Sequence, residues 1–285
     1  MTPRFVAEVS SNHGRDLARA LAFVETASRI GCAAVKFQLF KVDELFAPEI
    51  LAKSPKHRAR AQWELPEEFL APLAARSREL GIDLACTPFS LRAVDVLEPH
   101  VDFYKIASYE LLWDDLLRAC ARTGKPVVVA TGMATLDEVT RAVDVLREAG
   151  CADPMVLHCT SGYPTPIAQC NLAAIETLRA ATRARAGWSD HSVSPAVIYR
   201  AVHRWRAEMV EFHLDLDGAG AEFAAGHCWL PNDIAPVIDA IGFGVAADGS
   251  GLKAPVEAEI ADRPWRADPA DGLRPMRSIR ASWTP

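Results

Sequence analysis

Short apolar runs alternate with longer amphipathic stretches along most of the 285-residue chain, and this alternation restricts the fold more than any other feature. Each run is a few residues long, and several are apolar throughout, as expected of strands that are buried on both faces. Eight strand–helix units in a chain of this length predict an α/β fold, a (β/α)8 TIM barrel. The predicted strands are Phe5–Val9, Ala33–Phe37, Asp83–Cys86, Phe103–Ile106, Val127–Ala130, Met155–Leu157, Ala186–Trp188 and Met209–Phe212.

Helix signals fill the intervals between these runs. Asp16–Ile30 carries an apolar stripe and stops at a glycine. Thr135–Ala149 opens with a Thr-Leu-Asp-Glu capping box, and Arg118–Thr123 also ends before a glycine. A doubly wound open sheet is the competing fold, but neither GxGxxG nor GxxxxGK[ST] follows any predicted strand.

Two segments depart from the alternation. Lys41–Glu64 is rich in proline and charge, which predicts an irregular loop inserted over one mouth of the barrel. The chain from Gly242 is rich in Gly, Pro and Asp. We therefore expect a barrel at residues 1–242 and a C-terminal extension at residues 243–285 that packs on the barrel without forming a separate domain.

Composition excludes several classes of protein. The chain has 31 Lys and Arg against 37 Asp and Glu, so it lacks the basic excess of a nucleic-acid binder. No apolar run approaches the ~20 residues of a membrane span, and the N-terminus lacks the apolar region of a signal peptide. The seven cysteines form no CxxC pair, which is typical of reduced thiols. We expect a cytoplasmic protein with small-molecule substrates and neither nucleic-acid nor membrane partners.

Polar residues stand at the carboxyl ends of nearly all the predicted strands, and in a barrel these ends meet in one site. Two lysines among several hydroxyls suit an anion, most simply a phosphate, although either lysine could instead form a Schiff base, as in an aldolase. His191 and His213 follow consecutive strands and could share one divalent metal ion. The full set is Glu8, Lys36, Gln38, Thr87, Lys105, Ser108, Glu110, Thr131, His158, Ser189, Asp190, His191, Glu211 and His213.

Distinctive motifs occur in order from residue 5 to about residue 215. They are Ala7-Glu8-Val9-Ser10-Ser11-Asn12-His13-Gly14, Val35-Lys36-Phe37-Gln38, Thr87-Pro88-Phe89, Tyr104-Lys105-Ile106-Ala107-Ser108, Gly124-Lys125-Pro126, Thr131-Gly132-Met133-Ala134, His158-Cys159-Thr160-Ser161-Gly162-Tyr163-Pro164 and Gly187-Trp188-Ser189-Asp190-His191. Together they resemble the motifs of the sialic acid synthase (N-acetylneuraminate synthase) family.

The resemblance implies a metal-dependent transferase, using Mn²⁺ or Mg²⁺, that joins phosphoenolpyruvate to the aldehyde of an amino sugar and releases phosphate and a 2-keto-3-deoxy sugar acid. His191 and His213 would ligate the metal, and Glu8 would face the sugar and orient a metal-bound water. The residues that would bind phosphoenolpyruvate are Lys36, Thr87, Lys105, Ser108, Ser161 and Ser189. Those that would face the sugar are Gln38, Glu110 and Tyr163.

The chain also departs from the family pattern. Ala130 replaces a serine, Ser161 an asparagine, and Gly220-Ala221-Glu222 a Gly-Pro-Asp sequence. We expect the family's C-terminal antifreeze-like domain to be missing, so that the Lys41–Glu64 and Glu222–Trp229 segments cover the mouth. Glu222 and His227 would then grip the acceptor, with Phe223 and Trp229 as aromatic cover, unless Trp229 packs in the barrel wall. The acceptor need not be N-acetylmannosamine. A homodimer is one possible oligomeric state of the chain.

Three alternatives remain at this point. A ketodeoxyoctulosonate-like synthase would need a second basic cluster for the distal phosphate of its aldose, and the four candidate arginines lie mostly on helical patterns that favour a solvated face. A lysine aldolase would use Lys36 or Lys105 as the Schiff base. A non-catalytic homologue would have kept the barrel and lost turnover. The four arginines are Arg183, Arg185, Arg200 and Arg204.

Overall fold

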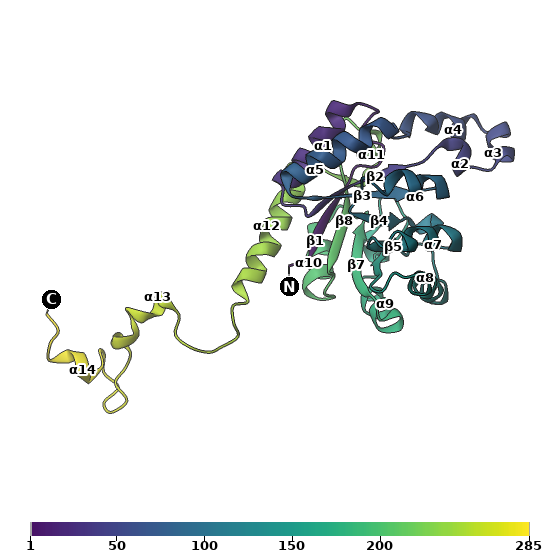
Figure 1. The fold of residues 1–285 in the computed structure, drawn as a ribbon. Coiled ribbons are helices and arrows are strands. Elements are labelled where there is room, and N and C mark those ends of the chain that lie inside the picture. The colour runs from purple at the N-terminus through teal and green to yellow at the C-terminus, as the bar shows by residue number, and fades with distance from the viewer. Residues whose placement is uncertain (1, 285) are drawn as a thin grey trace. The chain divides into compact units, whose positions relative to one another are not determined.

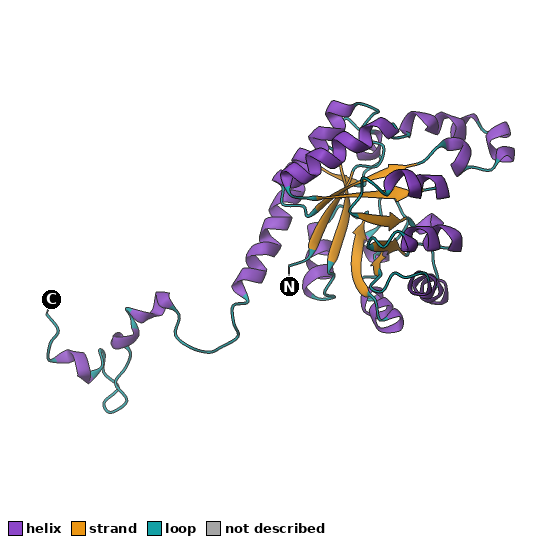
Figure 2. Ribbon diagram, in the orientation of Figure 1, coloured by secondary structure: helices purple, strands orange, loops and turns teal. Residues whose placement is uncertain are grey.

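All eight predicted strands form, and they close into a parallel barrel because the first strand pairs with the eighth. The computed structural model describes residues 2–284. Figures 1 and 2 show the strands enclosed by helices, so the (β/α)8 prediction is confirmed. The strands are β1 (Arg4–Glu8), β2 (Ala34–Leu39), β3 (Asp83–Pro88), β4 (Phe103–Ile106), β5 (Val127–Ala130), β6 (Met155–His158), β7 (Arg185–Asp190) and β8 (Met209–Leu214). A short parallel strand, β9 (Cys228–Trp229), extends the sheet beside the end of β8.

The helices follow the capping signals of the sequence. The Asp16 side chain accepts hydrogen bonds from the first turn of α1, and Thr135 and Glu138 form the predicted capping box of α8. The main helices around the barrel are α1 (Leu17–Arg29), α5 (Leu70–Leu80), α6 (Leu91–Leu97), α7 (Asp114–Arg122), α8 (Leu136–Glu148), α9 (Ala174–Thr182), α10 (Pro195–His203) and α12 (Pro231–Ala247), and the short elements between them are η2 (Glu67–Phe69), η3 (Ser108–Glu110), η4 (Ile167–Gln169) and α11 (Ala221–Ala224).

The interior of the barrel is layered because side chains alternate along each strand. Residues such as Val6, Ala34 and Phe103 form an apolar cluster inside the barrel. Two positions further along the same three strands stand Glu8, Lys36 and Lys105, which are also buried. The fold thus places a layer of charged side chains on an apolar layer, toward the carboxyl ends of the strands.

The segment 41–64 is helical rather than an irregular loop, so that prediction was wrong. It contains α2 (Val42–Leu45), α3 (Pro48–Lys53), α4 (Pro55–Arg58) and the 3₁₀ helix η1 (Ala59–Trp63). Its prolines start α3 and α4, where a proline needs no backbone donor, instead of breaking them. Glu64 fixes the base of the segment by accepting a hydrogen bond from the backbone of Val42.

The chain divides into two compact units between Phe243 and Gly244. Helix α12 runs through Gly242, so the last barrel helix extends past the predicted boundary. The second unit contains α13 (Glu257–Ile260), η5 (Arg263–Trp265) and α14 (Arg277–Arg280). That the extension packs on the barrel stays a prediction. Among residues 2–284, no helix combines the length and apolarity that a membrane crossing requires.

Removing the cap of α8 tests how much local capping stabilises the barrel. Thr135→Ala deletes the hydroxyl that accepts a hydrogen bond from the Glu138 backbone. We expect the free energy of unfolding to fall by about 1 kcal/mol and the melting temperature by about 2–4 °C. Thr135→Ser keeps the hydroxyl and should have the melting temperature of the wild type. An equal fall of the melting temperature in both variants would contradict the capping role.

Candidate active site

A cavity of about 830 Å³ opens at the carboxyl ends of the barrel strands. This volume is near the upper end of the roughly 300–1,000 Å³ of small-molecule sites. Of the residues that the sequence assigns to substrate or metal binding, all but Ser161 line it: Glu8, Lys36, Gln38, Thr87, Lys105, Ser108, Glu110, Tyr163, Ser189, His191, His213, Glu222 and His227. Three further strand-end residues that were expected at the same site, Thr131, His158 and Asp190, do not line the cavity. The cavity also contains Glu211 and Ala130.

A buried charge cluster of two lysines and two glutamates forms the floor of this cavity. Lys36 pairs with Glu8, and its Nζ lies 3.8 Å from Glu211 Oε2. Lys105 Nζ donates to Glu211 Oε1 at 2.9 Å. Each of the four is at most 8% exposed in its side chain, so the pairing offsets a large desolvation cost. Two positive and two negative charges balance inside the barrel.

Glu211 joins the two lysines and is held by β8. Its Oε1 also accepts a hydrogen bond from Ser189 at 3.1 Å. Burial raises the pKa of Glu211, but Lys105 and Lys36 outweigh burial and hold the pKa below the usual range. Burial lowers the pKa of Lys36 from 10.5 to about 7, against the attraction of Glu211. Gln38 donates to Glu8 at 2.9 Å and so orients this carboxylate.

Beside the cluster, a small polar niche surrounds Gly132. The Gly132 N–H donates to Ser108 Oγ at 3.0 Å, and Ser161 Oγ is buried without a hydrogen-bond partner among residues 2–284. A Cβ at position 132 would lie 2.2 Å from Ser161 Oγ and 2.9 Å from Ser108 Oγ. The glycine therefore keeps space open next to Ser161, whose unpaired hydroxyl calls for a polar ligand atom.

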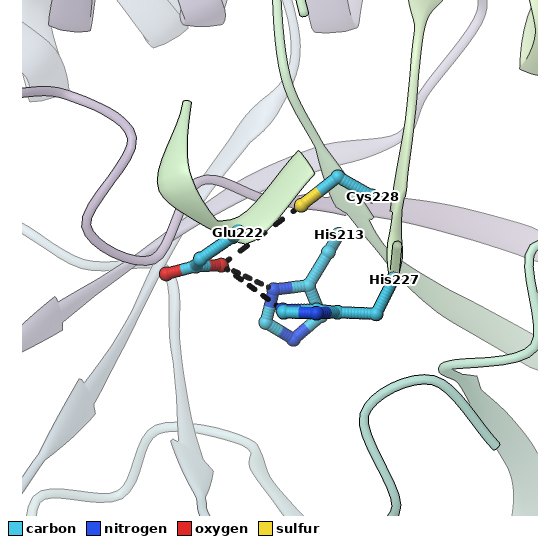
Figure 3. Close-up of side chains that lie close together, drawn as sticks. All are labelled: His213, Glu222, His227 and Cys228. Atoms are coloured by element: carbon cyan, nitrogen blue, oxygen red, sulfur yellow. Dashed lines mark hydrogen bonds and ion pairs between the residues drawn. The ribbon is translucent and has the colours of Figure 1, made fainter. Parts of the chain in front are cut away.

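Glu222 brings together two histidines and a cysteine, as Figure 3 shows. His213 Nδ1 donates to Glu222 Oε2 at 3.0 Å, and His227 Nε2 lies 3.5 Å from the same oxygen. The potential ligand atoms of these residues and Cys228 lie within 4.8 Å of one another. Strand β9 explains the grouping, because it pairs Cys228 with His213 and so carries His227 to the end of β8.

The donor set fits a divalent metal through its two histidines and its carboxylate. His227 Nδ1 is buried without a hydrogen-bond partner in the described chain, as a nitrogen reserved for a ligand would be. Burial raises the pKa of Glu222, but hydrogen bonds from His213 and His227 hold it well below the usual range, so this group is a carboxylate. Burial raises the pKa of Cys228 to about 12, which leaves a thiol and a poor ligand.

His191 lies beside this group but outside it. Its ring centroid is 5.4 Å from that of His213 and 4.2 Å from that of Tyr163. Its Nδ1 donates to the carbonyl of Thr160 at 2.9 Å, which leaves Nε2 as the free ring nitrogen. Burial, with a smaller effect of His213, lowers the pKa of His191 to about 3. That His191 and His213 share the metal stays a prediction, with His227 as the alternative partner.

The remaining walls combine one carboxyl group with aromatic rings. Glu110 follows β4, and one of its oxygens is buried without a partner among the described residues. Segment 41–64 adds Phe46, His57 and Trp63. Of the two positions expected for Trp229, the structure has the one in the barrel wall and not the aromatic cover: this residue is 2% exposed and donates through Nε1 to Asp190 at 3.0 Å. Tyr163 and the rings of segment 41–64 stand in its place.

Comparison with known proteins places the chain in a family. Residues 23–253 match the NeuB family. The uncharacterized protein MJ1065 of Methanocaldococcus jannaschii is 34% identical over 90% of this chain and 75% of its own length. The N,N'-diacetyllegionaminic acid synthase of Legionella pneumophila is 32% identical over 92% of this chain and 78% of its own length. The N-acetylneuraminic acid synthetase of Leptospira borgpetersenii, solved with citrate, is 27% identical with a TM-score of 0.80, over 92% and 90% of the two chains.

The pKa of Glu110 predicts a pH dependence of stability. Burial raises this pKa from 4.5 to about 7, so between these values the folded protein binds more protons than the unfolded chain. Stability contributed by the neutral carboxyl is complete below pH 4.5 and is lost as the pH rises through 7. Glu110→Gln removes this loss, so the variant should gain about 1–3 kcal/mol on the wild type between pH 5 and pH 8 in urea unfolding. The exposed Glu148→Gln serves as control; parallel curves for Glu110→Gln and the wild type would contradict the assignment.

Proposed function

Because the chain belongs to the NeuB family, we propose that it condenses phosphoenolpyruvate with a sugar aldehyde to give a 2-keto-3-deoxy sugar acid of the nonulosonate type and inorganic phosphate. The observation that carries this proposal is the buried charge cluster at the floor of the cavity, together with the unpaired Ser161 hydroxyl in the Gly132 niche. Relatives that are named as synthases of legionaminic and pseudaminic acid support the same class of reaction.

Phosphoenolpyruvate would lie over Lys36 and Lys105, with its phosphate toward the Gly132 niche. Ammonium groups and hydroxyls are the donors that a phosphate prefers, and burial strengthens each contact. Ser108, Ser189 and Thr87 supply hydroxyls in the cavity lining and Ser161 adds one in the Gly132 niche, while Ala130 offers none. The incoming negative charge would compete with Glu8 and Glu211 for the two lysines, and this keeps the lysines charged when substrate is bound.

A divalent metal held by His213, His227 and Glu222 would act as a Lewis acid on the aldehyde oxygen. Ser11 Oγ donates to Glu222 Oε1 at 2.8 Å and so keeps the other oxygen of this carboxylate toward the two histidines. Tyr163 packs against both imidazole rings, with centroids at 6.0 Å and 5.1 Å, and limits the access of water to them.

The reaction forms one carbon–carbon bond and one carbon–oxygen bond, from water to C2, and it breaks the bond between C2 and the bridging oxygen. The C3 carbon of phosphoenolpyruvate bonds to the aldehyde carbon, whose oxygen gains a proton, and water adds to C2. Inorganic phosphate then leaves with the bridging oxygen, and C2 becomes the ketone. Lys36 and Lys105 stabilise the negative charge of the phosphate, and Glu8, fixed by Gln38, lies where it could orient the water.

A lysine aldolase is the second candidate, since a lysine with a pKa near 7 can form a Schiff base. Borohydride with pyruvate tests it directly. We expect no reduced adduct on Lys36 or Lys105 by mass spectrometry, because both ammonium groups are paired with carboxylates. An adduct in the wild type that disappears in Lys36→Met would establish the aldolase instead.

The synthase is tested by phosphate release from phosphoenolpyruvate with a panel of aldoses, with Mn²⁺ or with EDTA. We expect release that requires both an aldose and the metal. Unchanged turnover in EDTA would contradict the metal role, and no release with any aldose would contradict the synthase.

Direct Mn²⁺ binding separates the two possible histidine pairs. Removing a residue that binds the metal directly should weaken Mn²⁺ binding by a large factor. This factor should exceed the roughly 10–100-fold loss that follows when a hydrogen-bond partner of such a residue is removed. We expect this of His213→Ala and His227→Ala in titration calorimetry, and a smaller loss in His191→Ala. A large loss in His191→Ala with none in His227→Ala would assign the metal to His191 and His213.

The Gly132 niche predicts a selective binding defect. Gly132→Ala fills the space beside Ser161 without demanding a strained backbone. We expect the KM for phosphoenolpyruvate to rise by about tenfold or more, with the KM for the aldose unchanged. Gly242→Ala, where an added Cβ meets nothing within 4 Å, is the control. An unchanged KM for phosphoenolpyruvate in Gly132→Ala would move the phosphate out of this niche.

A further inference from the structure

Arg60 differs from the other cations of the cavity. Among residues 2–284, the other Lys or Arg residues of the lining are Lys36 and Lys105, and both are paired with buried glutamates. The Arg60 side chain has no ion pair and no hydrogen bond within residues 2–284, although four glutamates line the same cavity. It comes from η1 of segment 41–64, while those glutamates come from the barrel and its rim.

The Arg60 guanidinium is held in place by aromatic rings. It lies over the rings of Phe46 and Trp63, at 5.3 Å and 5.4 Å from their centroids. Such stacking leaves all N–H donors of the guanidinium free. It also orders the Arg60 side chain in advance, so that less rotamer freedom is lost when a ligand binds. The fork of donors is therefore oriented before a ligand arrives.

The same wall offers a second nitrogen. His57 lines the cavity, packs edge-on against Phe46 at 4.8 Å, and uses Nδ1 in a 2.6 Å hydrogen bond with Ser54. Its Nε2 has no partner in the described part of the chain. The guanidinium and the imidazole both line the cavity and both pack on the Phe46 ring, and neither contacts a carboxylate. Such a wall suits an anionic oxygen group.

We infer that this wall binds a negatively charged group on the acceptor, at the end remote from the aldehyde. The inference rests on the proposed synthase activity, since phosphoenolpyruvate occupies the lysine cluster and the acceptor takes the remaining space. The group is a phosphate monoester or a carboxylate, because both accept two N–H donors of one guanidinium. None of the exposed arginines considered from the sequence lines the cavity, so Arg60 supplies the basic site that a charged aldose requires.

The test compares one aldose in three forms. N-acetylmannosamine, its 6-phosphate and its 6-carboxylate are assayed for phosphate release from phosphoenolpyruvate, and their binding is measured by calorimetry in the presence of phosphoenolpyruvate. We expect the wild type to bind at least one charged form about tenfold or more tightly than the neutral sugar. The preferred charged form identifies the group.

Arg60→Met keeps an apolar stem for the aromatic rings and removes the charge. We expect it to lose the preference for the charged acceptor by about tenfold or more, with the KM for phosphoenolpyruvate unchanged, and Arg60→Lys to restore part of the preference. Lys56→Met, on the same segment but outside the cavity, should behave as the wild type.

The outcomes separate the two claims. Charge-dependent binding that Arg60→Met abolishes supports the inference even if no acceptor releases phosphate, in which case the synthase proposal fails alone. Equal binding of the charged and neutral sugars by the wild type, binding of none of them, or an effect of Arg60→Met confined to phosphoenolpyruvate would overturn the inference.

Discussion

The pairing of Lys36 and Lys105 with Glu8 and Glu211 is the interaction on which the rest of the site depends. Four charged side chains buried inside a barrel would each cost several kcal/mol if left alone. Placed two against two, they form a stable floor that still presents cationic nitrogens to the cavity. The apolar layer below excludes water and strengthens every contact above it. A phosphorylated substrate can enter this arrangement by taking over the attraction that the carboxylates exert on the lysines.

The other groups of the cavity are positioned around this floor by separate structural elements. Strand β9 carries His227 to His213, and the Trp229 that follows is fixed by its hydrogen bond to buried Asp190. The helices of segment 41–64 bring a cation and aromatic rings to the lining. Under the proposed function, this cavity and the niche beside it would hold the phosphate, a metal ion and a charged acceptor. These are the parts that a condensation between two polar substrates needs.

Much of the fold and of the site could be predicted from the sequence. Barrel strands are recognisable as short apolar runs, and the last side chains of these strands lie on one rim. Glu8, Lys36 and the other strand-end residues were found in that way. What failed depended on contacts between distant segments. A strand of only two residues, such as β9, has no recognisable apolar pattern in the sequence. The position of His227 next to His213 could therefore not be predicted. Prolines that suggested an irregular loop instead begin helices, and this places Arg60, which the sequence did not single out, in the lining.

The central claim is that phosphate leaves phosphoenolpyruvate by cleavage of its carbon–oxygen bond, after water has added to C2 over the lysine cluster. Turnover in H₂¹⁸O tests this most directly, with the released phosphate analysed by mass spectrometry. The account predicts phosphate without solvent oxygen, since the bridging oxygen departs with phosphorus. One ¹⁸O atom in each phosphate would show attack at phosphorus and would contradict the account.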